Sequence, residues 1–379
     1  MPSGPDDWLR DQFTRAYRDQ AEKYGRFNLA IFGKTGVGKS TLVNAIFGEE
    51  VAATGIGEPV TPAAHLYVHS TDFLGVYDTR GLEIGVDTQR LLAELTDYVT
   101  SMRSKPIAEQ LHVAWYCVRY GDRRFEDAEA DVVDTLHRLG LPVILVITQV
   151  PTRNGVPHPD AVALAENIQG RDLPIYGRRA FFTMARPDTF TDQEAHGLQD
   201  VLDATFQVAP QAVEEALTAA QKIDAARKRK QADAKIAAAV TAASTAGATP
   251  IPFADAVLLV PIQLTMMAAI AQTYGVPMDR TTMAGLAATA GATSAGRSLV
   301  GGVIKLIPGA GAVAGGVINA SVAGSVTFAM GRAWMAVCQR LAKGELAGVD
   351  GALDSGAIRN LFSDEFRRQW KNRRQSGAD

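Results

Sequence analysis

The chain has few of the residues on which several kinds of site depend. Only two cysteines, Cys117 and Cys338, occur among the 379 residues, and their spacing is neither paired nor metal-like. A disulfide framework is therefore not expected, and both cysteines are predicted to be small buried side chains in a reducing compartment. The six histidines are scattered and suggest no catalytic triad or metal site, so His65 and His69 are interpreted as ordinary strand residues.

A surplus of charge of either sign is also missing. The 38 lysines and arginines face 41 acidic residues, for a formal net charge of -3. Because binding to a nucleic-acid backbone needs a basic surplus, no DNA partner is expected. Residues 1–30 lack a basic start followed by an apolar run, so no cleavable signal peptide is predicted and the N-terminal half is expected to face the cytosol.

Composition divides the chain into two parts. Up to about residue 210 it mixes charged, aromatic and β-branched residues, and after residue 236 it becomes rich in alanine and glycine with few charges. In the first part, apolar runs of strand length alternate with amphipathic segments of helix length, which predicts an α/β domain with a mainly parallel sheet covered by helices on both faces. The predicted strands are 29–32, 65–69, 73–77, 113–118, 142–147 and 180–183, and the predicted helices are 39–47, 87–101, 125–138, 160–168 and 195–207. We therefore predict an N-terminal helix in residues 1–26, a three-layer α/β domain in 27–210 and an all-α, Ala/Gly-rich domain in 211–379.

Two further helices are predicted outside the α/β pattern. Leu9, Phe13 and Tyr17 recur at spacings of four, and this apolar stripe is expected to pack along the domain that follows. A long alanine-rich helix without proline is predicted from about residue 210 to 246. Its middle, residues 222–235, is basic, which fits either a solvated helix face or a contact with anionic lipid or an acidic partner.

The motif that carries chemistry is GKTGVGKS, residues 33–40, which matches G-x-x-x-x-G-K-[ST] between the apolar run NLAIF and the helical pattern STLVNAIF. Glycines let the backbone turn tightly, so that successive N–H groups and the helix N-terminus converge on a phosphate. Lys39 places a cation against the β and γ oxygens, and the Ser40 hydroxyl can ligate Mg²⁺. The predicted phosphate-binding residues are Gly33, Thr35, Gly36, Val37, Gly38, Lys39, Ser40 and Thr41.

A second phosphate-sensing element is predicted in FLGVYDTRG, where Asp78 suits the outer Mg²⁺ shell and the Gly81 N–H can approach the γ-phosphate. The glycine- and proline-rich residues 51–64 read as a loop that γ-phosphate and Mg²⁺ could order, with Thr61 as the first choice to close over the metal and Thr54 as the second. A plain connecting loop is the alternative. The predicted metal ligands are thus Ser40, Thr61 and Asp78, and the predicted catalytic residues are Lys39, Thr61 and Gly81.

With these motifs, the first 210 residues resemble the Era and TrmE group of GTPases and, more loosely, the immunity-related GTPases. The matching stretches are GKTGVGKSTLVNAIFG, PVT, DTRGLE, HVAWYCV, LPVILVITQ and GLQDVLDAT. The remainder resembles the YcjF-like C-terminal domain that often follows such GTPase domains, through TPIPFADAVLLVPIQLTMMAAIAQTYGV and LIPGAGAVAGGVINASVAG. The resemblance implies a P-loop G domain that binds GTP and GDP with Mg²⁺ and hydrolyses GTP.

The base-side motifs depart from that group. Where its members read guanine with Asn or Thr, Lys, any residue and Asp, this chain has TQVP in residues 148–151, so the carboxylate that selects guanine is missing from its expected place. Thr148 and Gln149, together with Thr183 and Met184 at the position of the Ser-Ala pair, are the residues predicted on the base side. GTP is favoured by the resemblance, and an ATP-binding P-loop protein stays an alternative.

The hydrolytic apparatus departs from Ras-like switches as well. Leu82 stands where those have the glutamine that orients water, so hydrolysis is expected to be slow without an activator. Gly36 occupies the position where potassium-activated members carry asparagine, which leaves a partner, a second G domain, Glu83 or Arg80 as the helper. Arg80 also fits an exposed switch arginine without a catalytic role.

Two long runs in the second part are nearly free of charge. Residues 254–271 hold Asp255 at one end, are interrupted by Pro261 and would span about 27 Å as a helix, just short of a hydrocarbon core of about 30 Å. Residues 306–331 hold no charge and would reach about 39 Å, but they are rich in glycine and poor in leucine and phenylalanine. Length favours insertion into a membrane, and weak hydrophobicity favours a soluble bundle.

The basic segments 222–235 and 366–374 would fall on the same side of a membrane if both runs crossed it as a hairpin. Membrane association through residues 251–331, inserted or peripheral, is therefore one expectation. A helical bundle that packs on the G domain or on another chain is the other.

The resulting hypothesis is a GTP-hydrolysing switch in the cytoplasm, attached to or inserted in the cytoplasmic membrane, whose nucleotide state controls docking of the C-terminal domain. Guanine nucleotide, an anionic membrane surface and a G-domain dimer are the expected partners. The alternative of another class is a structural membrane-associated protein that holds nucleotide for stability and hydrolyses little.

Overall fold

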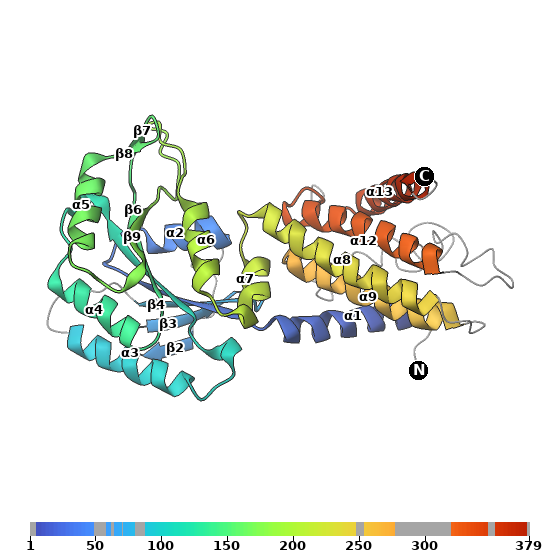
Figure 1. The fold of residues 1–379 in the computed structure, drawn as a ribbon, viewed down its shortest axis with the longest axis horizontal. Coiled ribbons are helices and arrows are strands. Elements are labelled where there is room, and N and C mark those ends of the chain that lie inside the picture. Colours follow the sequence, from blue (N-terminus) through green and yellow to red (C-terminus); the bar gives the residue numbers. More distant parts are fainter. Residues whose placement is uncertain are drawn as a thin grey trace. The chain divides into compact units, whose positions relative to one another are not determined.

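The computed structural model describes residues 5–48, 58–61, 64–69, 71–79, 88–247, 254–276, 320–347 and 353–376. Contacts divide the chain into two compact units. One is Tyr24–Ala225, and the other combines Met1–Lys23 with Ala226–Asp379. Figure 1 shows the first as an α/β unit and the second as a set of helices.

A seven-stranded sheet forms the centre of the α/β unit. In spatial order its strands are β2 (Glu58–Thr61), β3 (Ala64–Val68), β4 (Leu74–Thr79), β1 (Phe27–Phe32), β5 (Val113–Arg119), β6 (Val143–Thr148) and β9 (Ile175–Phe182). The pairs β2–β3 and β3–β4 are antiparallel, and the other pairs are parallel. The predicted mainly parallel sheet is confirmed. Strand β2 was not predicted, because its residues fall in the glycine- and proline-rich segment that was interpreted as a loop.

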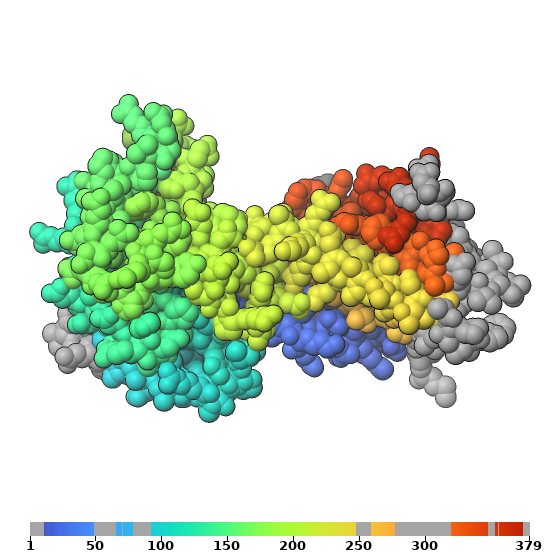
Figure 2. Space-filling model, viewed as in Figure 1, coloured from blue at the N-terminus to red at the C-terminus, as the bar shows by residue number. Residues whose placement is uncertain are grey.

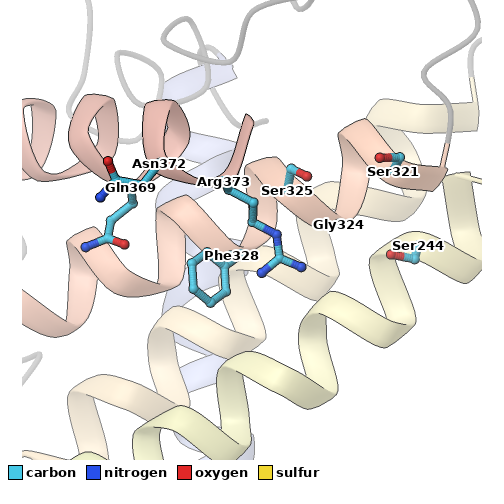
Figure 3. A pocket seen from close by; sticks show the side chains of 8 residues that line it. All are labelled: Ser244, Ser321, Gly324, Ser325, Phe328, Gln369, Asn372 and Arg373. Carbon is cyan, nitrogen blue, oxygen red and sulfur yellow. The ribbon is translucent and has the colours of Figure 1, made fainter. Parts of the chain in front are cut away.

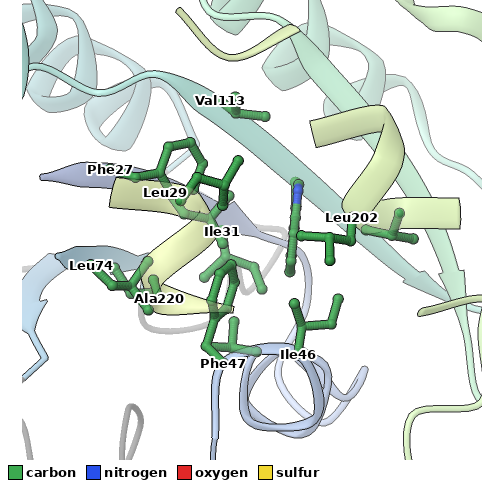
Figure 4. Close-up of a cluster of buried hydrophobic side chains, with 14 of the residues drawn as sticks. Phe27, Leu29, Ile31, Ile46, Phe47, Leu74, Val113, Leu202 and Ala220 are labelled. Carbon is green, nitrogen blue, oxygen red and sulfur yellow. The ribbon is translucent and has the colours of Figure 1, made fainter. Parts of the chain in front are cut away.

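Helices cover both faces of this sheet. They are α2 (Lys39–Phe47), α3 (Thr88–Met102), α4 (Asp127–Arg138), α5 (Pro159–Gln169), α6 (Leu198–Val208) and α7 (Glu214–Ala220). Buried side chains of α2, α6 and α7 pack on strand residues such as Leu29 and Val113 (Figure 4). On the other face α3, α4 and α5 pack on Ala30, Tyr116 and Leu145. Because successive strand residues point to opposite faces, the central strands are buried on both sides, as parallel strands require.

The long helix predicted over residues 210–246 is broken in the structure. It divides into α7 and α8 (Ala225–Gly247). The fully buried Gln221 stabilises the turn between the two helices. Its Nε2 donates to the Asp224 carbonyl at 2.9 Å, and its Oε1 accepts from the Asp224 N–H at 2.7 Å. Ala216 and Leu217 of α7 are buried in the core of the α/β unit. The structure thus ends this unit at residue 225 rather than at the predicted 210.

The second unit is built from α1 (Pro5–Tyr24), α8, α9 (Ala254–Thr273), α12 (Ala320–Ala342) and α13 (Ser355–Ser376). Its core includes Phe13 of α1 with Leu264 of α9 and Trp334 of α12. The Tyr17 hydroxyl donates to the Val276 carbonyl at 3.0 Å. The expectation that the N-terminal stripe packs along the following α/β domain is therefore wrong for Phe13 and Tyr17. Both side chains pack on the helices at the other end of the chain.

Small residues bring α8 and α12 together. A Cβ on Gly331 of α12 would lie 2.7 Å from Ile236 Cγ1, and a Cβ on Gly324 would overlap the Ser244 hydroxyl. Alanine at Gly331 would require Ile236 to shift, and alanine at Gly324 would require Ser244 to shift, since real Cβ atoms do not approach other atoms so closely.

Of the helices that the structure describes, none has both the length and the apolar character of a membrane span. Of the first uncharged run, Leu264 and Ile270 are buried in the core of the helical unit, and Gln263 Nε2 donates to Thr327 Oγ1 at 3.2 Å inside it. Helix α9 continues through Pro261, which was expected to interrupt it. Residues 277–319, which include part of the predicted insertion region, lie outside the described residues.

A buried histidine lies at the end of the sheet away from the glycine loop. His112 Nδ1 accepts the Asn28 N–H at 2.8 Å, and its Nε2 donates to the Ile107 carbonyl at 2.7 Å. Burial lowers the pKa of His112 from its ordinary value of 6.5. Since the unfolded chain binds the proton more readily, the histidine contributes stability that is complete above about pH 6.5 and is lost as the pH falls toward the lower folded-state pKa.

We therefore expect His112→Gln to lower stability at pH 7.5 by about 1–3 kcal/mol and to weaken the loss of stability between neutral pH and pH 5. Urea unfolding of the α/β unit, followed at several pH values, measures both effects. His137→Gln, at an exposed histidine of α4, is the matched control and should leave the profile unchanged. Parallel pH profiles of wild type and His112→Gln would contradict the assignment.

Candidate nucleotide-binding site

The loop between β1 and α2 has the backbone that its glycines allow. Gly33, Gly36 and Gly38 have φ values of 132°, 80° and 94°. A Cβ on Gly33 would overlap the Cys117 carbonyl oxygen at the end of β5. Glycine is thus required at Gly33 both by its dihedral angle and by the approach of the neighbouring strand.

Lys39, the first residue of α2, is fixed at this loop. Its side chain is 9% exposed, and its Nζ donates to the carbonyls of Gly33 at 2.9 Å and Lys34 at 3.1 Å. Burial lowers the pKa of Lys39, and the nearby carboxylate of Asp78 acts in the opposite direction. The ammonium group therefore stands at the loop with its charge balanced by carbonyl dipoles and one carboxylate, where phosphate oxygens would meet it.

Asp78 reaches the same edge of the sheet from β4. It is paired in register with Ile31 of β1, so the carboxyl ends of the two parallel strands coincide. Ser40 and Thr41 are exposed in the first turn of α2, and Thr35 is exposed on the loop. The structure thus brings a cation, a carboxylate and hydroxyl groups to one edge.

Of the predicted catalytic residues, the structure describes only the backbone of Thr61 and does not describe Gly81. The backbone of Thr61 ends β2 and is paired with Ala64, and its side chain lies outside the described residues. Thr54, Gly81 and the flanking residues 80, 82 and 83 also lie outside them.

Thr148 and Gln149 contact the glycine loop. The buried Thr148 hydroxyl donates to the Val37 carbonyl at 2.5 Å, with the Val118 carbonyl at 3.3 Å as a second acceptor. Gln149 has a left-handed φ of 57°, and its Nε2 donates to the Gly36 carbonyl at 3.3 Å. Both side chains therefore hold loop carbonyls, a supporting role that the comparison of motifs did not predict.

Thr183 and Met184 join the ends of β6 and β9. The buried Thr183 exchanges backbone hydrogen bonds with Ile147 at 2.9 Å and Val150 at 3.0 Å, and its hydroxyl lies 3.5 Å from the Ile147 carbonyl. Met184 pairs with His196 through two backbone hydrogen bonds of 3.1 and 3.0 Å. The two predicted base-side segments are therefore adjacent in the structure.

Beyond these segments the chain forms a hairpin, β7 (Thr152–Arg153) with β8 (Val156–Pro157), that projects from the α/β unit (Figure 2). The Thr152 N–H donates to Gln193 Oε1 at 2.7 Å, which ties this hairpin to the turn that carries Phe190. Val156 and Phe190 expose 63% and 95% of their surface. The hairpin directly follows Pro151, the residue at which the sequence analysis looked for a guanine-reading carboxylate.

An ion pair between the loop and α4 was missed by the sequence analysis. Lys34 Nζ lies 3.3 Å from Glu126 Oε1 and 3.4 Å from Glu129 Oε2. Glu129 is buried, which raises its pKa, and it accepts a hydrogen bond from the Tyr116 hydroxyl at 3.4 Å. The only available signal was the pair of acidic residues at the start of the predicted helix 125–138.

A Mg²⁺ ion at this site can take part of its ligands from the nucleotide. Within the described ranges, no group of three or more His, Cys, Asp or Glu side chains is placed to hold a metal ion. Mg²⁺ is commonly held by one or two protein oxygens together with phosphate oxygens and water. The exposed Ser40 hydroxyl and the Asp78 carboxylate fit such a shared site.

A glycine loop joining a buried strand to a helix, with Lys39 at its end and Asp78 on the adjacent strand, defines a P-loop nucleotide-binding domain. Residues 28–149 match the family described as 50S ribosome-binding GTPase, and residues 211–354 match the family described as a domain of unknown function, DUF697. The chain is a P-loop GTPase domain followed by a DUF697 domain.

Two curated relatives were found. Magnetosome membrane protein 22 of Magnetospirillum gryphiswaldense is 30% identical over 142 residues, which cover 36% of this chain and 66% of that protein. GTPase Der of Limosilactobacillus fermentum is 29% identical over 185 residues, which cover 47% of this chain and 36% of that protein. The chain thus spans slightly less than two thirds of the first relative and about a third of the second.

Solved structures with detectable likeness include Era of Aquifex aeolicus, crystallised as a variant bound to GDP and AlF4⁻. It has 18% sequence identity and a TM-score of 0.33, over 49% of this chain and 58% of that chain. Toc33 of Arabidopsis thaliana in complex with GDP and Mg²⁺ has 16% identity and a TM-score of 0.33, over 56% and 93% of the two chains.

Proposed function

We propose that this protein is a Mg²⁺-dependent, GTP-hydrolysing switch whose helical C-terminal domain docks on an anionic membrane surface or a partner according to the nucleotide state. The observation that carries the proposal is the Lys39 ammonium, buried at the end of a glycine loop and electrostatically coupled to Asp78. A buried cation next to converging N–H groups suits a triphosphate.

Each site residue has a role in this proposal. Lys39 neutralises charge on the β and γ oxygens, and Ser40 and Asp78 hold Mg²⁺ directly and through water. The Gly81 N–H and the Thr61 side chain close on the γ-phosphate and its metal. Thr148 and Gln149 keep the loop carbonyls turned away from the phosphates through their hydrogen bonds to Val37 and Gly36.

Slow hydrolysis is part of the proposal. Leu82 cannot hydrogen-bond to water, so nothing at its position orients the nucleophile. A partner or a second G domain would then supply the missing group.

Charged helix surfaces support docking on an anionic membrane. Arg229 and Lys230 are exposed on α8, and Arg367 and Lys371 are exposed on α13. The apolar side of α13, which includes Phe362, is buried in the core of the helical unit. Attachment through the described helices would therefore be electrostatic, by basic residues at the headgroups. One relative carries the words membrane protein in its name.

Single-turnover hydrolysis of GTP, with and without Mg²⁺ and anionic vesicles, tests the proposal. We expect slow turnover that requires Mg²⁺ and rises when vesicles are added. Ser40→Ala should reduce turnover about tenfold or more by removing a metal ligand, whereas Ser104→Ala, at an exposed serine remote from the loop, should not. Bound GTP that stays intact under every condition would instead favour a structural protein that holds nucleotide.

ATP is the second candidate nucleotide, because neither Thr148 nor Gln149 brings a carboxylate to the base side and Pro151 stands at the position of the guanine-reading aspartate. Competition separates the two candidates. Labelled GTP that resists a large excess of ATP supports guanine selectivity, and strong displacement supports an ATP-binding protein.

A further inference from the structure

A cavity of about 590 Å³ lies within the helical unit, among α8, α12 and α13 (Figure 3). The described residues of its lining contribute hydroxyl, amide and guanidinium groups and no carboxylate. The residues that line it are Ser244, Ser321, Gly324, Ser325, Phe328, Gln369, Asn372 and Arg373. A lining of hydrogen-bond donors and one cation, without an anionic group, matches an anionic ligand.

Arg373 is the cation of this cavity, and an aromatic ring holds it in place. Its guanidinium carbon lies 4.3 Å from the centroid of the Phe328 ring (Figure 3). Arg332 lies 5.3 Å from the same centroid, but its charge is matched by Asp233 at 2.7 Å. Arg373 forms no ion pair with a carboxylate of the described residues. Stacking leaves the N–H groups at the rim of the guanidinium available to an anion.

Close helix packing places hydroxyl groups at this position. Gly324 lets α8 approach α12 so closely that the Ser244 hydroxyl occupies the space of the missing Cβ. Ser321 and Ser325 stand on α12 one turn apart (Figure 3). Within the described part of the chain these three hydroxyls make no hydrogen bond, so each can donate to a ligand.

We propose that this cavity binds a phosphate group. Arg373 would provide the charge-assisted, two-pronged contact that guanidinium makes with phosphate, and the serine hydroxyls would bind the remaining oxygens. The phosphate could belong to a lipid headgroup or to a soluble phosphate ester, because both present the same oxygens. The site is separate from the glycine loop and does not depend on the proposed hydrolysis.

Two probes applied to the full chain test this site. Inorganic phosphate is titrated by calorimetry, and vesicles of phosphatidylcholine and phosphatidic acid in a ratio of about four to one are used in a sedimentation assay. Arg373→Gln should weaken binding of at least one probe about tenfold or more. Arg368→Gln removes the same charge from an exposed position on the same helix, where the charge is already paired with Glu365 at 2.7 Å. This variant should change the binding of either probe less than about twofold. Phosphate binding at the glycine loop is common to both variants and cancels in the comparison.

The two probes also separate the sources of the phosphate. Loss of vesicle binding in Arg373→Gln alone identifies a headgroup, and loss of inorganic phosphate binding alone identifies a soluble ester. Equal losses in both variants, or no effect of either, would overturn the proposal, because the attraction would then be diffuse or absent.

Substitution of the cavity glycine gives an independent check. Gly324→Ala should displace Ser244 and reduce binding of the responsive probe, whereas Gly331→Ala perturbs the same pair of helices at Ile236, away from the lining. Equal effects of the two alanines would show that general loosening, rather than the cavity, controls binding.

Discussion

Lys39→Ala is expected to abolish nucleotide binding, with a loss of affinity of at least about a hundredfold. The reason is geometric as well as electrostatic. The ammonium is buried and held by the Gly33 and Lys34 carbonyls, so no exposed lysine can replace it. Displacement of a fluorescent GTP analogue, or calorimetry with GTP and Mg²⁺, measures the loss.

Lys34→Ala is the matched control, because it removes the other ammonium group of the same loop. The Lys34 side chain pairs with Glu126 and Glu129 of α4. Its loss should lower stability while leaving affinity within about fivefold, as expected for a partly exposed ion pair. Micromolar GTP affinity retained in Lys39→Ala would refute the site.

Truncation should show a similarly large effect on folding. A fragment of residues 24–225 is expected to fold and to bind nucleotide, whereas a fragment of residues 24–210 is expected to unfold or to melt at a much lower temperature. The shorter fragment lacks α7, whose Ala216, Leu217 and Ala220 are buried in the core of the α/β unit. A buried leucine alone contributes about 2–5 kcal/mol.

Circular dichroism melting curves of the two fragments measure this difference. Leu217→Ala within the longer fragment is a milder perturbation of the same packing. It should lower the melting temperature of the fragment by several degrees, because 1 kcal/mol corresponds to about 2–4 °C for a domain of this size. Equal melting temperatures of the two fragments would show that α7 does not belong to the folding unit.

Much of the α/β domain could be predicted because its signals are local. The motif GKTGVGKS predicts the local backbone conformation, because its glycines and Lys39 bind phosphate together only at a strand-to-helix turn. The apolar runs of β5 and β6 predicted central strands because both faces of a parallel sheet are covered. The match of residues 28–149 to a GTPase family and the match of residues 211–354 to DUF697 both agree with the family resemblances found in the sequence.

The features that could not be predicted depend on contacts across the fold. The stripe that includes Phe13 showed which side of α1 is apolar, but the pattern does not predict which element that side packs against. The break between α7 and α8 depends on Gln221, whose hydrogen bonds with Asp224 form only when the chain turns there. Similarly, the hydrogen bonds of Thr148 and Gln149 to the glycine loop could not be predicted from these two residues, because they form only when β6 places the residues beside the loop.

The grouping of α1 with α8 means that the GTPase domain is an insertion, attached to the helical unit by one covalent link before β1 and another after α7. At the first link, Tyr24 is buried in the same core as β1 and lies against Phe73, with ring centroids 5.6 Å apart. At the second, α7 contacts β1 and β4. The glycine loop follows β1 directly, and Asp78 lies near the end of β4, directly before Thr79. Both links to the helical unit are therefore fastened to the two strands that lead to the phosphate-binding residues.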